Sequence, residues 1–495
     1  MAKKSVYLGF DIGASNGRAV LGFLDGQKLT LKEINRFSNG PVELGGTLYW
    51  DFLSLWQAVL KSMEICNKAG YTKLSGIGID TWGVDFGLIG NSGQLLSNPI
   101  CYRDSRTEGI EKTIARKMSE KEFYRLTGLG IGRILTLSQL AARLKYDGKS
   151  ALDSAKSLLF IPDLFRYFLC GQKCVDATGA GSSALADVNS RKWSTKIFKR
   201  FDIPMRIMPP IVEPGTPAGQ LLPEISRQTG IKSALIGVIA GHDSLSAAAA
   251  IPTIDKNCAF LNCGTWSVLG IVSDKPVLSE EACARGFVNE LGLGSVVFVK
   301  NMTGLYLFEN LYRCLKQEKP ELTYEEMVSY AAKAKPFEIF LNIGDPEFFL
   351  SDDPRVSVEA FLKRTRQKVR PNCGGIIRAI LESLVFSYKA ALKDLERLTG
   401  RTFNRISMAG GGIRNELLCR MTADATGCEI IAGPAEATIA GNIGVQAMAA
   451  GKLKGPAEIR EMIRNSFKLK KYEPTNTGLW DRAFENYKTY SNVKQ

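Results

Sequence analysis

The chain has 495 residues, 45% hydrophobic and 23% charged, which is ordinary for a soluble globular protein of roughly two to four domains. The formal charge of +14 favours anionic ligands. The basic residues are scattered, however, and no basic helix carries interleaved aromatics, so we do not expect a nucleic-acid partner.

The cysteine and histidine counts narrow the class of protein further. The 11 cysteines include no CxxC pair, and the single histidine excludes a His-rich metal site. This usage favours a reduced, cytoplasmic protein. The sequence has no signal-peptide core and no apolar run approaching the ~18 residues of a membrane span, so we expect no membrane partner. Nothing in the sequence indicates the oligomeric state.

Strands and helices are predicted along the first half of the chain from apolar periodicity and turn residues. An Asp-Gly pair at 25–26 is a strong hairpin signal. The predicted elements are strands at 6–10, 19–24, 28–34, 47–50 and 74–80, a helix at 52–70, a hairpin of strands 84–89 and 94–100, and a mostly helical stretch at 111–167.

The second half repeats this plan, with weak similarity in the letters themselves. Its predicted strands lie at 258–262, 266–272, 294–300, 405–409 and 428–432, and its helices at 305–315, 375–398, 415–426 and 437–450. We therefore predict two similar α/β lobes with a seam soon after Asp243. The domain ranges we expect are 1–246, 247–478, and a C-terminal helix or tail at 479–495.

A short apolar strand predicted at 235–239 leads into Gly241, the single histidine His242, and Asp243. A carboxylate at the end of a buried strand, where a small-residue helix begins, is well placed to take a proton from a bound hydroxyl. The alternative is that Asp243 merely caps that helix. Three other stretches supply what a general base would need.

Two hairpin turns have the composition of phosphate-binding loops. In the first, Gly13 and Gly17 let backbone amides face a phosphate, Arg18 adds a cation, and Asp11 is suited to hold Mg²⁺ through water. The alternative is an ordinary hairpin with a turn-forming Asn-Gly. The turn at 263–265 lies at the matching hairpin of the second half. A pair of such loops favours a ligand that carries phosphate groups.

A glycine run at 410–412 follows a predicted strand and precedes a predicted helix. Glycines there permit close approach to a base or ribose, and a helix N-terminus suits phosphate. The alternatives are a tight turn between strand and helix or a degenerate dinucleotide fingerprint, but the spacing is not GxGxxG.

The stretch DTWGVDF at 80–86 places an aromatic, a bare backbone and a carboxylate at a strand end. Polyol ligands favour such mixtures, and Arg103 with Asp104 could complete a pocket. The alternative is that Trp82 belongs to the core and Asp85 to a turn.

Taken together, these motifs resemble those of the FGGY carbohydrate kinases in order and spacing. The residues that carry the resemblance are Asp11-Ile-Gly-Ala, Gly241-His-Asp, Gly264-Thr-Trp and Gly410-Gly-Gly-Ile-Arg-Asn415. Within the family, DTWGVDF at 80–86, YRDSRT at 102–107, ASNGR at 14–18 and KNMTGLYL at 300–307 are most similar to members that act on L-rhamnulose.

The resemblance covers nearly the whole chain and implies an α/β fold of two actin-like, ribonuclease-H-type ATPase domains with the active site in the cleft between them. It implies ATP and Mg²⁺ as cofactors and phosphorylation of L-rhamnulose at its C1 hydroxyl in L-rhamnose catabolism. Another ketose, such as L-fuculose, is the alternative substrate.

Residue roles also follow from the resemblance, with Asp243 as general base and Asp11 as the Mg²⁺ residue. The implied substrate-binding residues are Gly83, His242, Asp243, Ser244 and Asn301, with Trp82, Asp85 and Arg103 near the sugar. The implied ATP-binding residues are Ala14, Ser15, Asn16, Gly17, Arg18, Gly264, Thr265, Glu309, Gly410, Gly411 and Asn415. His242 could instead orient Asp243 or be a satisfied core histidine, and Glu309 could face solvent. Cys263 stands where the family usually has serine.

Two other protein classes compete with a kinase. A catalytically inactive sugar-binding or actin-like assembly protein would have no use for Asp11, Thr265 and Asp243 together. A dinucleotide oxidoreductase is disfavoured because no proper fingerprint is present.

Overall fold

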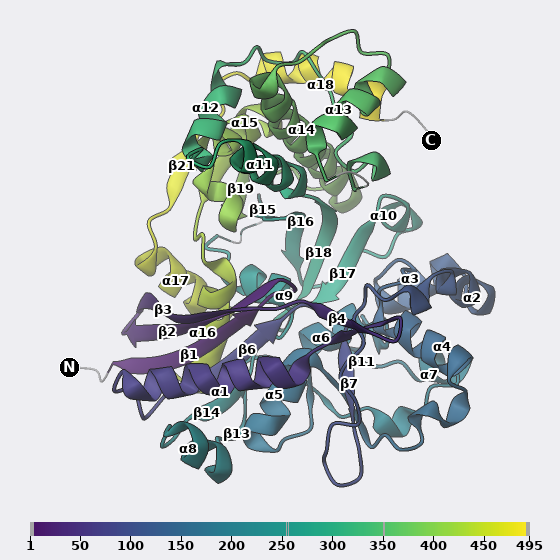
Figure 1. Cartoon of the computed structure of the whole chain (residues 1–495), viewed down its shortest axis with the longest axis vertical. Coiled ribbons are helices and arrows are strands. Elements are labelled where there is room, and N and C mark those ends of the chain that lie inside the picture. The colour runs from purple at the N-terminus through teal and green to yellow at the C-terminus, as the bar shows by residue number, and fades with distance from the viewer. Residues whose placement is uncertain (1–3, 254, 256, 350–351, 492–495) are drawn as a thin grey trace. The chain divides into compact units, whose positions relative to one another are not determined.

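The computed structural model describes residues 4–253, 255, 257–349 and 352–491 (Figure 1). The chain divides into two compact units. The first unit comprises Met1–Pro252, Val272–Phe298 and Ala437–Phe467, and the second comprises Thr253–Ile271, Val299–Glu436 and Lys468–Gln495. These units differ from the predicted domain ranges because two later segments group with the first part of the chain.

A six-stranded sheet of order β13-β14-β6-β1-β2-β3 forms the centre of the first unit. β1, β2 and β3 are successive antiparallel strands, β6 and β14 run parallel to β1, and β13 is antiparallel to β14. The bounds are β1 Ser5–Ile12, β2 Asn16–Asp25, β3 Lys28–Ser38, β6 Gly76–Thr81, β13 Thr216–Gln220 and β14 Leu235–Val238.

Helices cover both faces of this sheet. Leu8 and Phe10 of β1 point into the core formed with α1 (Phe52–Lys68) and α5 (Ile161–Cys170). Because side chains alternate along a strand, Gly9 faces the other side, where α16 (Ala437–Ala449) lies. The apolar stripe predicted for the helix at 52–70 is confirmed by the buried face of α1.

The close packing of α16 explains why Ala437–Phe467 belongs to the first unit. A Cβ on Gly9 would lie 2.6 Å from Ile439 Cδ1. A Cβ on Gly441 would lie 1.8 Å from the carbonyl oxygen of Ser246 in α9 (Asp243–Ala249). Only glycine allows such an approach, so Gly9 and Gly441 let α16 pack closely on the sheet and on α9.

The predicted hairpin forms only close to its turn. Phe86–Ile89 (β7) is its first strand; Gly90 N–H donates to Gln94 O and Leu96 N–H donates to Leu88 O, each at 2.9 Å, and Ile89 and Leu95 make an antiparallel bridge. β7 also pairs antiparallel with Ser157–Phe160 (β8), a partner that the sequence did not predict. All residues of both strands are buried. Because a strand has two edges, β7 pairs with β8 and also with the segment that follows its turn.

The remaining elements of the first unit are short. Its strands are β4 Pro41–Leu44, β5 Thr47–Trp50, β9 Val175–Asp176, β10 Ala186–Asp187, β11 Lys192–Trp193, β12 Ile211–Val212 and β17 Phe287–Leu291. Its helices are α2 Ile110–Lys117, α3 Glu120–Thr127, α4 Thr136–Tyr146, α6 Ala177–Ser182, α7 Thr195–Arg200, α8 Pro223–Thr229, α10 Glu280–Ala284 and α17 Pro456–Ser466, with 3-10 turns at Ser105–Thr107, Lys149–Leu152 and Met205–Ile207.

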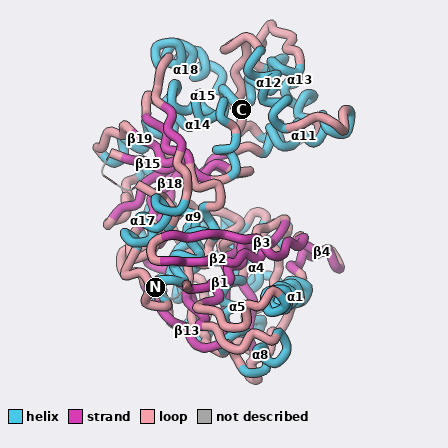
Figure 2. The backbone as a smooth tube through the Cα atoms, turned by 90° about the vertical axis from the view of Figure 1, so that its left-hand side faces the viewer, coloured by secondary structure: helices cyan, strands magenta, loops and turns pink. Residues whose placement is uncertain are grey.

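The strands of the second unit belong to a seven-stranded sheet of order β17-β18-β16-β15-β19-β20-β21. Figure 2 shows strands in magenta and labels β15, β18 and β19. β15 is antiparallel to β16 and parallel to β19, just as β1 is antiparallel to β2 and parallel to β6. The bounds are β15 Cys258–Cys263, β16 Trp266–Ser273, β18 Val296–Thr303, β19 Arg405–Ala409, β20 Glu429–Ala432 and β21 Lys470–Tyr472. The repeated strand plan predicted from the sequence is thus present in both units.

The second unit's helices are α11 Tyr306–Glu318, α12 Tyr324–Lys333, α13 Pro354–Arg364, α14 Cys373–Thr399, α15 Glu416–Thr426 and α18 Thr477–Ser491, with 3-10 turns at Pro346–Phe349 and Gly411–Arg414. The C-terminal helix α18 packs on α14, where Trp480 contacts Phe386 and Asp481 pairs with Lys389 at 2.6 Å. Among the described helices, none has both the length and the hydropathy needed to cross a membrane.

Candidate active site

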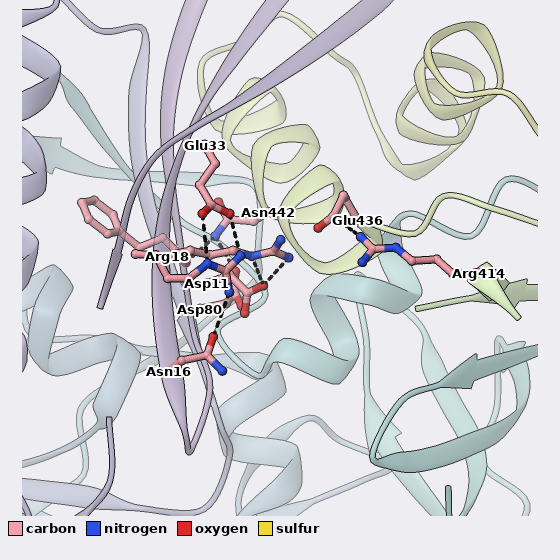
Figure 3. Close-up of polar contacts among 10 residues, drawn as sticks. Asp11, Asn16, Arg18, Glu33, Asp80, Arg414, Glu436 and Asn442 are labelled. Carbon is pink, nitrogen blue, oxygen red and sulfur yellow. Dashed lines mark hydrogen bonds and ion pairs between the residues drawn. The ribbon is translucent and has the colours of Figure 1, made fainter. Parts of the chain in front are cut away.

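Two carboxylates meet at the carboxyl ends of β1 and β6. Asp11 and Asp80 are opposite each other in the strand register and lie on the α16 side of the sheet (Figure 3). Asp80 is fully buried; Asn442 Nδ2 donates to its Oδ2 at 2.5 Å, and its Oδ1 has no hydrogen-bond partner. Burial first, and then the carboxylates of Asp11 and Asp243, raise the pKa of Asp80 well above its usual range.

Asp11 also pairs with Arg18, its cross-strand neighbour. Arg18 Nη2 and Nε donate to Asp11 Oδ2 at 2.8 and 3.1 Å. The Asp80 Oδ1 atom and the adjacent Asp11 carboxylate suit Mg²⁺, which keeps most of its waters and uses one or two protein carboxylates. The described residues contain no group of three or more His, Cys, Asp or Glu that could hold a metal, so the fit is to a hydrated ion.

The turn between β1 and β2 is held from the end of β3. Gly13 N–H donates to Asn16 O at 2.9 Å, and Asn39 donates from its backbone N to Ser15 O and from Nδ2 to Gly13 O. A Cβ on Gly17 would lie 2.3 Å from Phe37 Cε2. The predicted phosphate residues therefore lie in this turn (Ala14 and Ser15) and at the start of β2 (Asn16, Gly17 and Arg18), and Ser15 and Asn16 are exposed.

The predicted general base begins α9. His242 is the N-cap residue and Asp243 the first helical residue, so the cap position that one interpretation gave to Asp243 belongs to His242. Asp243 Oδ1 accepts hydrogen bonds from Ser244 N at 2.6 Å and Ser244 Oγ at 3.1 Å. The Asp243 side chain is 33% exposed, which leaves its second oxygen accessible to a ligand.

Buried residues at the N-terminal end of α6, the N-cap Asp176 and the helical Thr178, hold the loop that carries this base. Gly241 N–H donates to Asp176 Oδ1 at 3.3 Å, and His242 N–H donates to Thr178 Oγ1 at 3.2 Å. Thr81 N–H of β6 donates to Gly241 O at 2.8 Å. Sequence reasoning missed Asp176 and Thr178, because neither lies in a motif near the residues that it supports.

The His242 imidazole lies between a serine and the general base. Its Nδ1 is 2.9 Å from Ser182 Oγ, and its Nε2 is 3.6 Å from Asp243 Oδ1. A Cβ on Gly83 would lie 3.1 Å from Nε2, so the ring packs directly on the bare backbone of that residue. Glu290 Oε1 of β17 is 4.0 Å from Nδ1, and burial raises the pKa of Glu290.

Asp85, predicted to lie near the sugar, is only 1% exposed. Its carboxylate accepts hydrogen bonds from Trp50 Nε1 (2.5 Å), Trp82 Nε1 (2.9 Å), Gln139 Nε2 (2.8 Å) and Tyr102 N (3.2 Å). The two indole rings lie 4.1 Å apart. Asp85 therefore orients both indole rings through their N–H groups. Trp82 is part of the buried core, as one alternative predicted.

The backbone between Trp82 and Asp85 is strained. Val84 has φ +69°, in the left-handed region that a β-branched residue rarely adopts, and Thr136 Oγ1 donates to its carbonyl oxygen at 2.6 Å. Nearby, Arg103 is exposed; its Nε donates to the Tyr102 hydroxyl at 3.0 Å and its guanidinium lies over that ring. Strain of this kind concentrates at ligand sites.

The matching turn in the second unit joins two predicted ATP residues. Thr265 Oγ1 donates to Glu309 Oε2 at 3.1 Å, and burial raises the pKa of Glu309. Gly264 N–H donates to Trp266 O at 3.0 Å, while Gly264 O accepts from Leu305 N at 2.8 Å. Trp266 is 62% exposed beside this turn.

The glycine run packs on the same hairpin. A Cβ on Gly410 would lie 2.7 Å from Cys263 O, whereas one on Gly411 would meet no atom within 4 Å. Cys263 itself is fully buried with its Sγ 3.2 Å from Tyr388 OH, so its thiol faces the core. Asn415 is buried and caps α15. Of these residues, Gly411 is the one open to a ligand.

Two further polar residues of the second unit are exposed. Asn301, predicted to lie around the sugar, is on β18. Arg414 Nη2 pairs with Glu436 Oε1 at 2.9 Å (Figure 3).

Comparison with known proteins decides the family. Residues 6–250 match the N-terminal domain of the FGGY family of carbohydrate kinases, and residues 259–450 match its C-terminal domain. The chain belongs to this family. It is 36% identical to a rhamnulokinase of Bacteroides thetaiotaomicron, over 98% of this chain and 99% of that one, and 34% identical to a rhamnulokinase of Enterococcus faecalis, over 95% and 94%.

The fold of this FGGY kinase is also found in solved structures. A gluconate kinase from Lactobacillus acidophilus superposes with a TM-score of 0.81 at 17% identity and covers 99% of this chain and 98% of that one. The predicted family and the actin-like ATPase fold are thereby confirmed. The expectation that the active site lies between the two domains stays a prediction.

Proposed function

We propose that this FGGY kinase transfers the γ-phosphate of ATP to the C1 hydroxyl of L-rhamnulose. The observation that carries the proposal is Asp243, a partly exposed carboxylate held by Ser244 beside His242 and Gly83, in a chain that is similar over 98% of its length to a rhamnulokinase. This is the residue set that the sequence motifs implied for the base and the sugar.

Asp243 acts as the general base. Its carboxylate accepts the proton of the C1 hydroxyl while that oxygen forms a bond to the γ-phosphorus. The bond between the γ-phosphorus and the β–γ bridging oxygen breaks, and ADP leaves. Positioning and charge stabilisation dominate this reaction class, and a positioned proton acceptor contributes typically ~10²–10⁴-fold.

The sugar is bound by backbone and side chains of the motifs at 80–86 and 241–243, both in the first unit. Gly83 lets it approach His242, whose imidazole lies against that backbone. Arg103 borders the sugar, and the buried Trp82 and Asp85 support this site from the core, where the carboxylate holds the indole. Asn301, exposed on β18, is the remaining residue that we propose to bind the sugar.

ATP is bound by the two hairpin turns and the glycine run. Backbone amides at 14–18 and the Gly264-Thr265 turn bind phosphates, and the open Gly411 lies against the adenosine. Glu309 acts by orienting the Thr265 hydroxyl. Asp11 and Asp80 would hold the waters of Mg²⁺, which when bound neutralises phosphate charge.

A panel of ketoses with coupled ADP detection tests the substrate. We expect L-rhamnulose to give the highest kcat/KM; a higher value for L-fuculose or another ketose would replace it as substrate. Asp243→Asn should retain sugar binding and lose most turnover, while Asp25→Asn, at an exposed aspartate of β2, should not change turnover. Unchanged turnover in the Asp243 variant would refute its assignment as the base.

A further inference from the structure

The proton balance around Ser182 determines which imidazole nitrogen of His242 carries hydrogen. A serine hydroxyl has one proton to donate. Ser182 Oγ donates it to Thr178 O, 3.0 Å away within α6, and also lies in hydrogen-bond contact with the Glu290 carboxyl group. A carbonyl oxygen can only accept, so the Ser182 proton that is directed at Thr178 O is not available to His242. His242 Nδ1, 2.9 Å from the same Oγ, is therefore the donor of their shared hydrogen bond.

The charges on the two sides of the ring compete unequally. Glu290 Oε1 lies 4.0 Å from Nδ1 and favours a proton there. Asp243 Oδ1 favours a proton on Nε2, but it is 3.6 Å away, beyond hydrogen-bond distance, and already accepts from Ser244 N and Oγ. The 2.9 Å contact to Ser182 therefore prevails.

We propose that Ser182 and Glu290 are positioning residues that keep His242 as the Nδ1–H tautomer. Nε2 then has a lone pair directed over Gly83, where it accepts a hydrogen bond from a hydroxyl of the bound ketose. The same tautomer has no N–H to donate to Asp243, so the carboxylate stays available for the reacting hydroxyl. The last two consequences depend on the proposed kinase function, whereas the tautomer does not.

Because the chain has a single histidine, the tautomer can be measured directly. Protein carrying ¹⁵N-labelled histidine and no histidine tag gives one pair of imidazole nitrogen signals, and protonated and unprotonated nitrogens have well-separated chemical shifts. We expect a protonated Nδ1 and an unprotonated Nε2 in the wild-type chain at neutral pH. A protonated Nε2 with unprotonated Nδ1 would overturn the proposal without any variant.

Variants then identify the residues responsible. Ser182→Ala removes the acceptor for Nδ1–H, and Glu290→Gln replaces the carboxylate with a group that can donate. Both should move the signals toward the Nε2–H tautomer, whereas Glu43→Gln, at an exposed glutamate of β4, should leave them unchanged. Unmoved signals in both variants would overturn the roles of Ser182 and Glu290.

Kinetics give the second measurement. Glu290→Gln should lower kcat/KM for the ketose about tenfold, the equivalent of one hydrogen bond, and leave the KM for ATP unchanged. An equal loss toward ATP and ketose would indicate general damage and refute a positioning role. If no ketose is phosphorylated by the wild-type chain, the proposed function fails while the tautomer result stands separately.

Discussion

The buried carboxyl group of Asp85 should make stability depend on pH. Burial raises the pKa of Asp85 from 3.8 to about 6, although N–H groups of Trp50, Trp82, Gln139 and Tyr102 all donate to it. In the unfolded chain the group is solvated and titrates near its ordinary value. Folding therefore takes up a proton on Asp85 between these two values. The variant Asp85→Asn has a similar shape and cannot do so.

The sign and size of this pH dependence follow from the linkage between proton binding and folding. Because the folded pKa lies above the unfolded one, the folded state binds more protons in this window, and the free energy of unfolding falls as pH rises from about 4 to about 6. A difference of about 2 between the two pKa values corresponds to roughly 3 kcal/mol at 1.36 kcal/mol per pKa unit, of which roughly 2 kcal/mol changes between about pH 7 and pH 4.

Urea unfolding followed by tryptophan fluorescence measures this difference. We expect the wild-type chain to gain roughly 2 kcal/mol of stability relative to Asp85→Asn as the pH falls from about 7 to about 4, because contributions from all other groups cancel. Asp25→Asn is the exposed control and should show little such dependence. A constant difference between wild type and Asp85→Asn would refute the reasoning. If acidification instead lowered the stability of the wild-type chain relative to Asp85→Asn, the four hydrogen-bond donors, and not burial, would dominate the pKa of Asp85.

Two further changes test the packing of α16 and the cation site. Gly441→Ala places a Cβ 1.8 Å from the Ser246 carbonyl oxygen, so we expect calorimetry to show a loss of about 1–3 kcal/mol or more, whereas Gly455→Ala, which meets no atom within 4 Å, should be nearly neutral. Equal stability of the two variants would contradict the packing of α16 on α9. Asp80→Asn removes the carboxylate whose Oδ1 has no partner, and Mn²⁺ binding in the presence of ATP, followed by electron paramagnetic resonance, should weaken about tenfold. Undiminished Mn²⁺ affinity would remove Asp80 from the cation site.

Local sequence patterns predicted most of the strands that position the site. The strand at 405–409 is β19 to the residue, and the helix at 437–450 differs from α16 by one residue at its end. Such segments carry their own periodicity, which neighbours reinforce. The pairing of β7 with β8 was missed because a strand partner far away in the chain is selected by burial, which neighbouring residues do not record.

The residues of the candidate site also divide into those that local motifs predicted and those that they did not. Asp11, His242 and Asp243 could be predicted as candidates because they lie beside glycines and strand ends in short motifs. Ser182 and Glu290 were missed, since each is an unremarkable residue in its own stretch and gains a role only through contact with His242.

By itself, the sequence determined the family, the repeated α/β plan and the short stretches that carry the chemistry, because those properties reside in neighbouring residues. Only the tertiary structure decided that Asn442 lies on Asp80, 362 residues away in the chain, and that Asp85 is enclosed by two indoles. The physical reason is that burial and hydrogen-bond partnership arise when distant segments pack. The same packing, and not the local sequence, sets the pKa of a buried carboxyl group and the tautomer of the imidazole.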